Sequence, residues 1–457
     1  MGTIKVDFMQ NKLLTTVLVF LVCLFLAIAG LLLAETIPPD LFNQRAWSAL
    51  EAFDQSYQRV PLLFGRNNSV MDYYGDALMY QTTMNAPGKS ILENALVSPV
   101  YVPSHQFDDL GNHLMVQGLR ERLDGAEPNT PHAHYWDGFK LPLRILGSLF
   151  DYTAILFINA MLLLAFVVYC SVLLWRFLDW RTSIAFLLSC LLMNLVAVTW
   201  CLELSGVIFI FLLGMIAVLL TAKDGRLVKY GYSLFLLLGI LTAFFDLFTA
   251  PLLSLGFPLI VAVCCLLKSN YKIDTRRILL LGIEWCGFWL LGYMGFWLIK
   301  ILVTAVFFLP ALPDFFVTKI RDYSTPTYSW FMSITSGLLF NLGTMVGAEH
   351  STITYFTGSL IYSGLLYRAL AGLMLLILPV LLSVWIIKKN DIDFRAAWLL
   401  PLIALLPLLR LLLSVTHATE HSFMTFREWG IAYFAVFSFF AVIYQSKLSR
   451  SKLIDTD

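Results

Sequence analysis

The chain has 457 residues, of which 59% are hydrophobic and 13% charged, and its mean hydropathy is +0.77. A chain this apolar is typical of a multi-pass membrane protein and excludes an ordinary water-soluble domain. The formal net charge of +1 excludes a strongly basic nucleic-acid-binding surface.

Apolar runs long enough to cross about 30 Å of hydrocarbon as helices recur along the chain. We expect about ten of them, which predicts an all-α membrane protein that forms a single membrane-embedded unit over residues 1–457. The expected spans lie near 14–34, 152–175, 182–200, 204–222, 231–250, 252–267, 278–306, 369–387, 396–414 and 429–445.

The first span has a second interpretation, a cleaved signal peptide. Its apolar core from Leu13 to Ala34 is longer than a typical signal-peptide core. No small-x-small cleavage motif follows it before Glu35. We therefore expect an uncleaved anchor.

A large first extracytoplasmic loop is expected over 35–150, and it holds two polar motifs. In the first, Asp72 and Asp76 stand at i and i+4 and share a face if the segment is helical. Two carboxylates on one face suit a general base with a supporting acid or ligand. A solvated acidic turn is the alternative interpretation.

The second motif, His-Ala-His-Tyr-Trp-Asp-Gly, directly precedes the second span and contains His132, His134 and Asp137. Interfacial anchoring explains its aromatic residues but not the two histidines and the aspartate. Alternating histidines can bind a metal or a phosphate, although their i, i+2 spacing alone is a weak metal signal.

Four charged residues fall inside the expected spans: Asp246, Glu284, Lys300 and Arg410. A charge at mid-bilayer costs roughly 3 kcal/mol even on the lenient insertion scale, so each requires a partner or a water-filled cavity. We expect Asp246 to face a site, and Lys300 and Arg410 to hold a lipid phosphate below the outer interface. Glu284, nearer the inner end, is expected to pair with an inner-loop arginine.

A second large extracytoplasmic loop is expected over 307–367, and a shorter one joins the last two spans. The shorter loop carries His417 and His421 at i and i+4, with Arg427 nearby. Because arginine forms forked hydrogen bonds to phosphate oxygens, this pattern indicates an anion-handling cluster. A hydrated hairpin is the alternative.

Charge decides the expected orientation. More than half of the 31 Lys and Arg residues lie in alternate short connections and at the two ends of the chain. By the positive-inside rule, these segments and both termini are cytoplasmic in the cell (plasma) membrane. This orientation puts on the outer face every histidine of the chain: His105, His113, His132, His134, His350, His417 and His421.

The expected cytoplasmic connections are short and contain neither G-x-x-x-x-G-K-[ST] nor G-x-G-x-x-G. A sugar or phosphate donor must therefore be lipid-linked or arrive from outside. The residues call for no defined cofactor, and a divalent metal is left open.

Five blocks scattered over most of the chain carry a resemblance. They are Met71-Asp72 through Met79, Tyr135 through Gly138, Phe245-Asp246 through Pro251, Gly292-Tyr293 through Lys300, and His421 through Arg427. In these blocks, and in a large first loop followed by about ten helices, the chain resembles the GT-C class of integral membrane glycosyltransferases. It resembles more closely a set of bacterial multi-pass proteins linked to surface polysaccharide. Asp137 departs from the pattern, which has histidine there.

The resemblance implies transfer of a sugar from a polyprenyl-phosphate-linked donor to a cell-envelope glycan or lipid acceptor at the outer membrane face. It implies Asp72 or Asp76 as the catalytic base, the latter as runner-up. The implied donor-phosphate ligands are Arg427, His421, Arg410 and Lys300. The implied acceptor or supporting contacts are Asp137, Asp246, His134 and His417. The implied partners are the lipid-linked sugar, the glycan acceptor and membrane lipid, with no nucleic acid.

Two other function classes stay open. In a flippase or transporter of a lipid-linked or polar solute, the charges within the spans would line a pathway, although the chain has no internal duplication. A non-catalytic assembly subunit predicts instead that single substitutions of the outer carboxylates and histidines are tolerated.

Overall fold

The computed structural model describes residues 2–54, 59–61, 67–103, 114–222, 225–268, 274–326, 329–348, 365–390 and 395–454. Within these ranges the chain is almost entirely α-helical, with one antiparallel ribbon of strands β1 (Arg59–Pro61) and β2 (Val70–Asp72). His105, His113 and His350 lie outside the described residues.

Seven described helices are long and apolar enough to cross a membrane. They are α1 (Gly2–Thr36), α7 (Tyr152–Phe177), α10 (Leu202–Ala222), α11 (Arg226–Phe245), α13 (Thr275–Phe307), α17 (Leu365–Asn390) and α22 (Trp429–Ile454). Shorter apolar helices are α8 (Trp180–Leu192), α12 (Leu253–Lys268) and the pair α18 (Leu399–Ile403) and α19 (Leu406–Leu413). The predicted all-α membrane protein is confirmed, and ten crossings stay a prediction.

Aspartates begin several of these apolar helices. The side chain of Asp151 accepts a hydrogen bond from Ala154 N at 2.8 Å, and that of Asp274 accepts one from Arg277 N at 2.7 Å. Such N-caps satisfy amide groups that the first helical turn leaves without partners. An apolar run therefore becomes a helix with a defined start.

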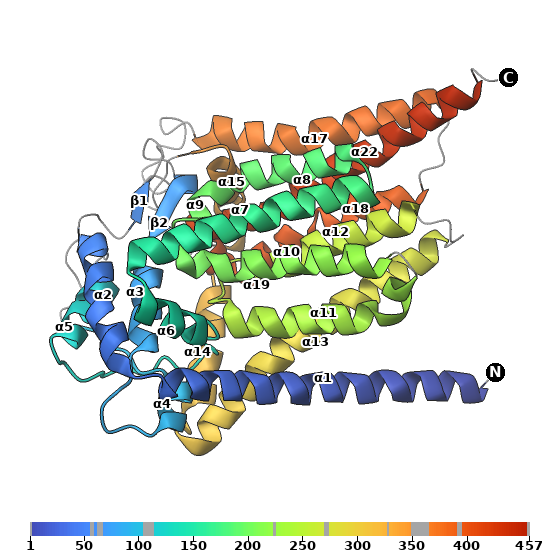
Figure 1. Ribbon diagram of the computed structural model, residues 1–457. Helices are drawn as coiled ribbons and strands as arrows, with labels where there is room; N and C mark the ends of the chain where they lie inside the picture. Colours follow the sequence, from blue (N-terminus) through green and yellow to red (C-terminus); the bar gives the residue numbers. More distant parts are fainter. Residues whose placement is uncertain are drawn as a thin grey trace.

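The expected first loop is folded rather than extended. It forms α2 (Pro39–Asp54), α3 (Tyr73–Thr83), α4 (Ile91–Val97), α5 (Leu114–Leu123) and α6 (Lys140–Leu149). These helices cover one end of the bundle, which we call the capped end (Figure 1). The chain begins and ends at the opposite end, which we call the termini end (Figure 1).

Buried basic residues hold this cap together. Lys140 Nζ lies 2.8 Å from a carboxylate oxygen of Glu35 and donates to Asn94 O at 2.8 Å. Arg144 donates to Thr83 O at 2.8 Å, and Arg122 donates to Gln81 O at 2.7 Å. Because buried charges require partners, these contacts tie α3 and α4 firmly to the start of the bundle.

The remaining described elements are short or lie between the longer helices. They are η1 (Asn67–Ser69), α9 (Leu195–Val198), α14 (Leu312–Ser324), α15 (Trp330–Met345), η2 (Arg395–Trp398), α20 (Val415–Glu420), α21 (Ser422–Thr425) and η3 (Phe426–Glu428). Of the expected second loop, 307–367, the described residues include α14 and α15, and α15 packs against α17 and α20.

Candidate functional site

The pair of aspartates in the first loop lies at the start of α3. Asp72 is the N-cap, and its Oδ1 accepts hydrogen bonds from Tyr74 N at 3.1 Å and Gly75 N at 3.4 Å. Asp72 is 3% exposed, so this carboxylate is part of the protein interior and not a solvated turn.

Asp76 bridges three elements. Its carboxylate accepts hydrogen bonds from the Tyr152 hydroxyl at 2.7 Å, from Leu202 N at 3.1 Å and from Glu203 N at 3.0 Å. Burial raises the pKa of Asp76 to about 6, although these hydrogen bonds act to lower it. Asp76 therefore caps the first turn of α10 from a neighbouring helix.

Glu203, which the sequence analysis did not single out, joins the first two motifs. A Cβ atom at Gly75 would stand 1.7 Å from Glu203 Oε2, so a larger residue there would force the Glu203 side chain to move. Burial raises the pKa of the Tyr135 hydroxyl, and the neighbours that raise it further are Tyr323, Tyr293, Asp246 and Glu203. The signal in the sequence that could have identified Glu203 was an acidic residue at the start of an otherwise apolar span.

The second motif is held by hydrogen bonds to the end of α11 and to the second half of α13. Gly138 N donates to Phe244 O at 2.8 Å, after a left-handed turn at Asp137, whose φ is 55°. Trp136 Nε1 donates to Phe296 O at 2.9 Å, and Trp297 Nε1 donates to His134 O at 2.6 Å. The aromatic residues therefore position this motif within the protein.

Asp137 is buried among basic groups. His132 Nδ1 lies 3.5 Å from Asp137 Oδ1. Burial by itself raises the pKa of Asp137, but the facing His132, Lys140 and Lys300 lower it below its usual value. Lys300 itself donates to Leu96 O, at the end of α4, at 2.5 Å. Lys300 thus lies with Asp137 and ties α13 to the cap.

Asp246 and Arg410 belong to a third group of residues. Asp246 Oδ1 accepts hydrogen bonds from the Thr249 amide and hydroxyl. Arg410 lies 3.9 Å above the Phe248 ring, donates to Phe248 O at 2.9 Å, and places Nη2 3.0 Å from His417 Nδ1. The pKa of His417 lies well below 6.5, mainly because the ring is buried and also because Arg410 and His421 are near it.

Glu428, a second residue that sequence reasoning did not single out, completes this group. Its Oε1 accepts from Leu252 N at 3.3 Å, and it interacts electrostatically with Arg410 and Asp246. Within the described ranges, Glu428 Oε2, Asp246 Oδ2 and Arg410 Nε are buried without a hydrogen-bond partner. Buried polar atoms without a hydrogen-bond partner are uncommon in folded proteins, which makes this group a candidate site for a polar ligand.

Arg427 is 1% exposed and interacts electrostatically with Cys201. Its Nη1 donates to Phe423 O at 3.0 Å, while Nε and Nη2 are buried with no hydrogen-bond partner in the part of the chain that the structure describes. Cys201 connects it to the aspartates, because Arg427 interacts electrostatically with Cys201, whose Sγ lies 3.8 Å from Asp76 Oδ1.

The candidate site residues therefore form three neighbouring groups at the capped end. In the first, Cys201 contacts Asp72 O and Asp76 Oδ1 and interacts electrostatically with Arg427. In the second, Lys300 contacts α4 and interacts electrostatically with Asp137 and His134. The third group contains Asp246, Arg410, His417 and His421. Tyr135 and Glu203 lie between the groups.

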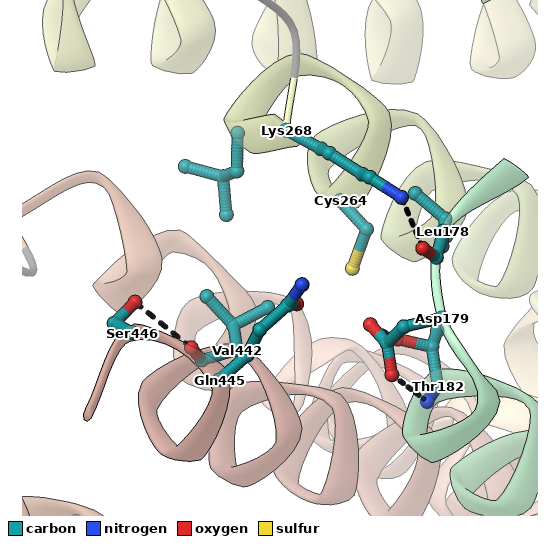
Figure 2. A pocket seen from close by; sticks show the side chains of 9 residues that line it. Leu178, Asp179, Thr182, Cys264, Lys268, Val442, Gln445 and Ser446 are labelled. Carbon is teal, nitrogen blue, oxygen red and sulfur yellow. Dashed lines mark hydrogen bonds between the residues drawn. The ribbon is translucent and has the colours of Figure 1, made fainter. Parts of the chain in front are cut away.

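Two cavities differ in character. One of about 60 Å³ lies beside the capped-end groups and is lined partly by His134, Tyr135, Tyr323 and Ser414. Another of about 270 Å³ lies at the termini end (Figure 2). There Lys268 donates to Leu178 O, and the Asp179 side chain accepts from Thr182 N. These two charged residues are therefore hydrogen-bonded to the backbone where α7 ends and α8 begins. The unpartnered polar atoms thus favour the capped end as the site.

No three His, Cys, Asp or Glu side chains among the described residues are grouped so as to hold a metal ion. Comparison with family models, with curated proteins and with solved structures gives no match. The interpretation of the site therefore depends on its own geometry.

Proposed function

We propose that the protein is a membrane glycosyltransferase that moves a sugar from a polyprenyl-phosphate-linked donor to a cell-envelope glycan or lipid acceptor at the outer face. The observation that carries this proposal is the buried guanidinium of Arg427, with two nitrogens lacking a partner among the described residues. A buried cation needs an anion, and phosphate oxygens match the guanidinium fork.

In the proposed reaction, an acceptor hydroxyl oxygen attacks the anomeric carbon of the donor. The new carbon–oxygen bond forms as the bond to the lipid phosphate breaks, and the departing phosphate keeps the electron pair. A carboxylate takes the proton of the acceptor hydroxyl. Arg427 and Arg410 stabilise the negative charge on the departing phosphate.

We assign the base to Asp72 and a positioning role to Asp76. Both oxygens of Asp76 already accept hydrogen bonds, from Tyr152 and from the first amides of α10. Taking up a proton there would disturb the start of that helix. The buried oxygens of Asp246 and Glu428 that lack partners are proposed to accept hydrogen bonds from sugar hydroxyls.

The distribution of charge favours this function over a transporter, whose pathway needs polar groups through the bundle. Asp246, Lys300 and Arg410 contact capped-end residues. Glu284 instead pairs with Lys12 of α1, and not with the inner-loop arginine that we expected. Between Glu284 and Lys300, α13 carries no charged residue.

The test is transfer of radiolabelled sugar from synthetic polyprenyl-phosphate donors by the purified protein. Asp72→Asn and Arg427→Gln are expected to lower kcat by about 100-fold or more. The exposed residues Asp314 and Arg321 of α14 provide the matched controls Asp314→Asn and Arg321→Gln, which are expected to keep wild-type transfer.

Full transfer by a protein carrying both Asp72→Asn and Asp76→Asn would contradict the assignment of the base. A wild-type protein that binds the lipid donor without turnover, across a broad panel of donors, would favour the flippase or assembly-subunit alternative.

A further inference from the structure

An apolar groove of about 330 Å³ lies between α8, α17 and α22, apart from the capped-end site. Its walls include Leu188, Leu378, Leu382, Phe437 and Phe440. Pro379 of α17 also lines it. In the described structure its one charged lining residue is Arg181, which lies with Trp180 and Tyr444.

Arg181 is at the mouth of the groove nearest the termini end. It belongs to the first turn of α8, and its guanidinium lies 4.7 Å from the Trp180 ring and 5.5 Å from the Tyr444 ring. Arg181 Nε is buried and has no hydrogen-bond partner within the described ranges. Trp180 is 50% exposed, as expected of an aromatic anchor at a membrane interface.

The groove extends from this charge into the bilayer. On α22 its lining runs from Tyr444 back to Phe437, a distance of roughly 10 Å along the helix. An apolar floor with a cation at its interfacial end complements an acyl chain that leads to an anionic headgroup.

We propose that this groove binds one anionic glycerophospholipid from the leaflet at the termini end. Its phosphate contacts Arg181, and one acyl chain lies along α8, α17 and α22. The site is independent of the proposed transferase activity.

The test is native mass spectrometry of the purified protein with phosphatidylglycerol or phosphatidylcholine of identical acyl chains. Wild-type protein is expected to retain one phosphatidylglycerol selectively. Arg181→Gln is expected to weaken this binding about tenfold, the effect of removing one charge-assisted hydrogen bond. Arg176, exposed in the last turn of α7 and outside the groove, provides the control Arg176→Gln, which is expected to bind normally.

A second pair of variants tests the apolar part. Leu382 and its neighbour Leu381 are both exposed, but Leu382 lines the groove and Leu381 does not. Leu382→Trp is expected to exclude the lipid and Leu381→Trp to retain it. The proposal is overturned if either variant pair binds equally, or if wild-type protein retains both lipids equally, because the groove then holds an annular lipid only.

Discussion

Asp72 and Asp76 are equivalent in the sequence, as two carboxylates separated by one helical turn. The structure distinguishes them, because Tyr152 and the first amides of α10 surround only Asp76. Asp76 therefore connects helices, and Asp72, the N-cap of α3, is the proposed base. The same distinction applies to arginines, since buried Arg144 has backbone partners while two nitrogens of Arg427 lack partners within the described ranges.

At the scale of single residues, the lowered pKa of His417 predicts that the stability of the protein depends on pH. Its pKa lies well below 6.5 in the folded protein, so below pH 6.5 the unfolded chain binds a proton there that the folded chain does not. Stability therefore falls as the pH falls below 6.5. The groups facing His417 are Arg410, His421, Phe248 and Tyr323.

Thermal unfolding at about pH 7.5 and about pH 5.5 tests this prediction. His417→Gln keeps an acceptor for Arg410 but cannot titrate, so its unfolding temperature is expected to fall less than that of the wild type on acidification. Part of the decrease should persist, because burial also lowers the pKa of His134. An identical decrease in both proteins would contradict the prediction.

At the scale of elements, α11 and α13 pack backbone to backbone. A Cβ atom at Gly239 would stand 2.1 Å from Trp289 O, and one at Gly292 would stand 2.3 Å from Leu236 O. Small residues permit such close approach between membrane helices, where van der Waals contact replaces the hydrophobic effect as the driving force. This packing places the ends of both helices, and so Asp246 and Lys300, beside the cap.

Gly292→Ala is therefore expected to separate the two helices and to destabilise the protein by about 1–3 kcal/mol, the usual cost of overpacking. Gly287 on the same helix provides the control, because a Cβ atom there meets nothing within 4 Å. The measurement is the unfolding temperature in detergent. Equal unfolding temperatures for Gly292→Ala and Gly287→Ala would show that the close approach is not required.

At the scale of the whole molecule, both ends of the chain lie at the end of the bundle opposite the cap (Figure 1). The positive-inside rule assigns that end to the cytoplasm. A phosphatase fused to the C-terminus is therefore expected to be inactive, whereas one inserted after Ala126, in the first loop, is expected to be active. The reverse pattern would invert the topology and move the proposed site to the inner face.

The sequence by itself determined the helical membrane class. A helix in lipid forms all of its backbone hydrogen bonds internally, so a long apolar run is enough to specify it. It also indicated the polar motifs, whose spacing is local, whereas the capping role of Asp72 was seen only in the structure. The function that these motifs were taken to imply stays a prediction.

Only the tertiary structure decided which motifs share a site. Glu203 lies against Gly75, Lys300 reaches Leu96, and Arg427 lies near Cys201, although each pair is far apart in the chain. No local pattern encodes these contacts, because they arise where helices pack side by side and leave their ends together. The packing of the helices thus decided which buried charged groups have hydrogen-bond partners and which keep atoms without one in the described ranges.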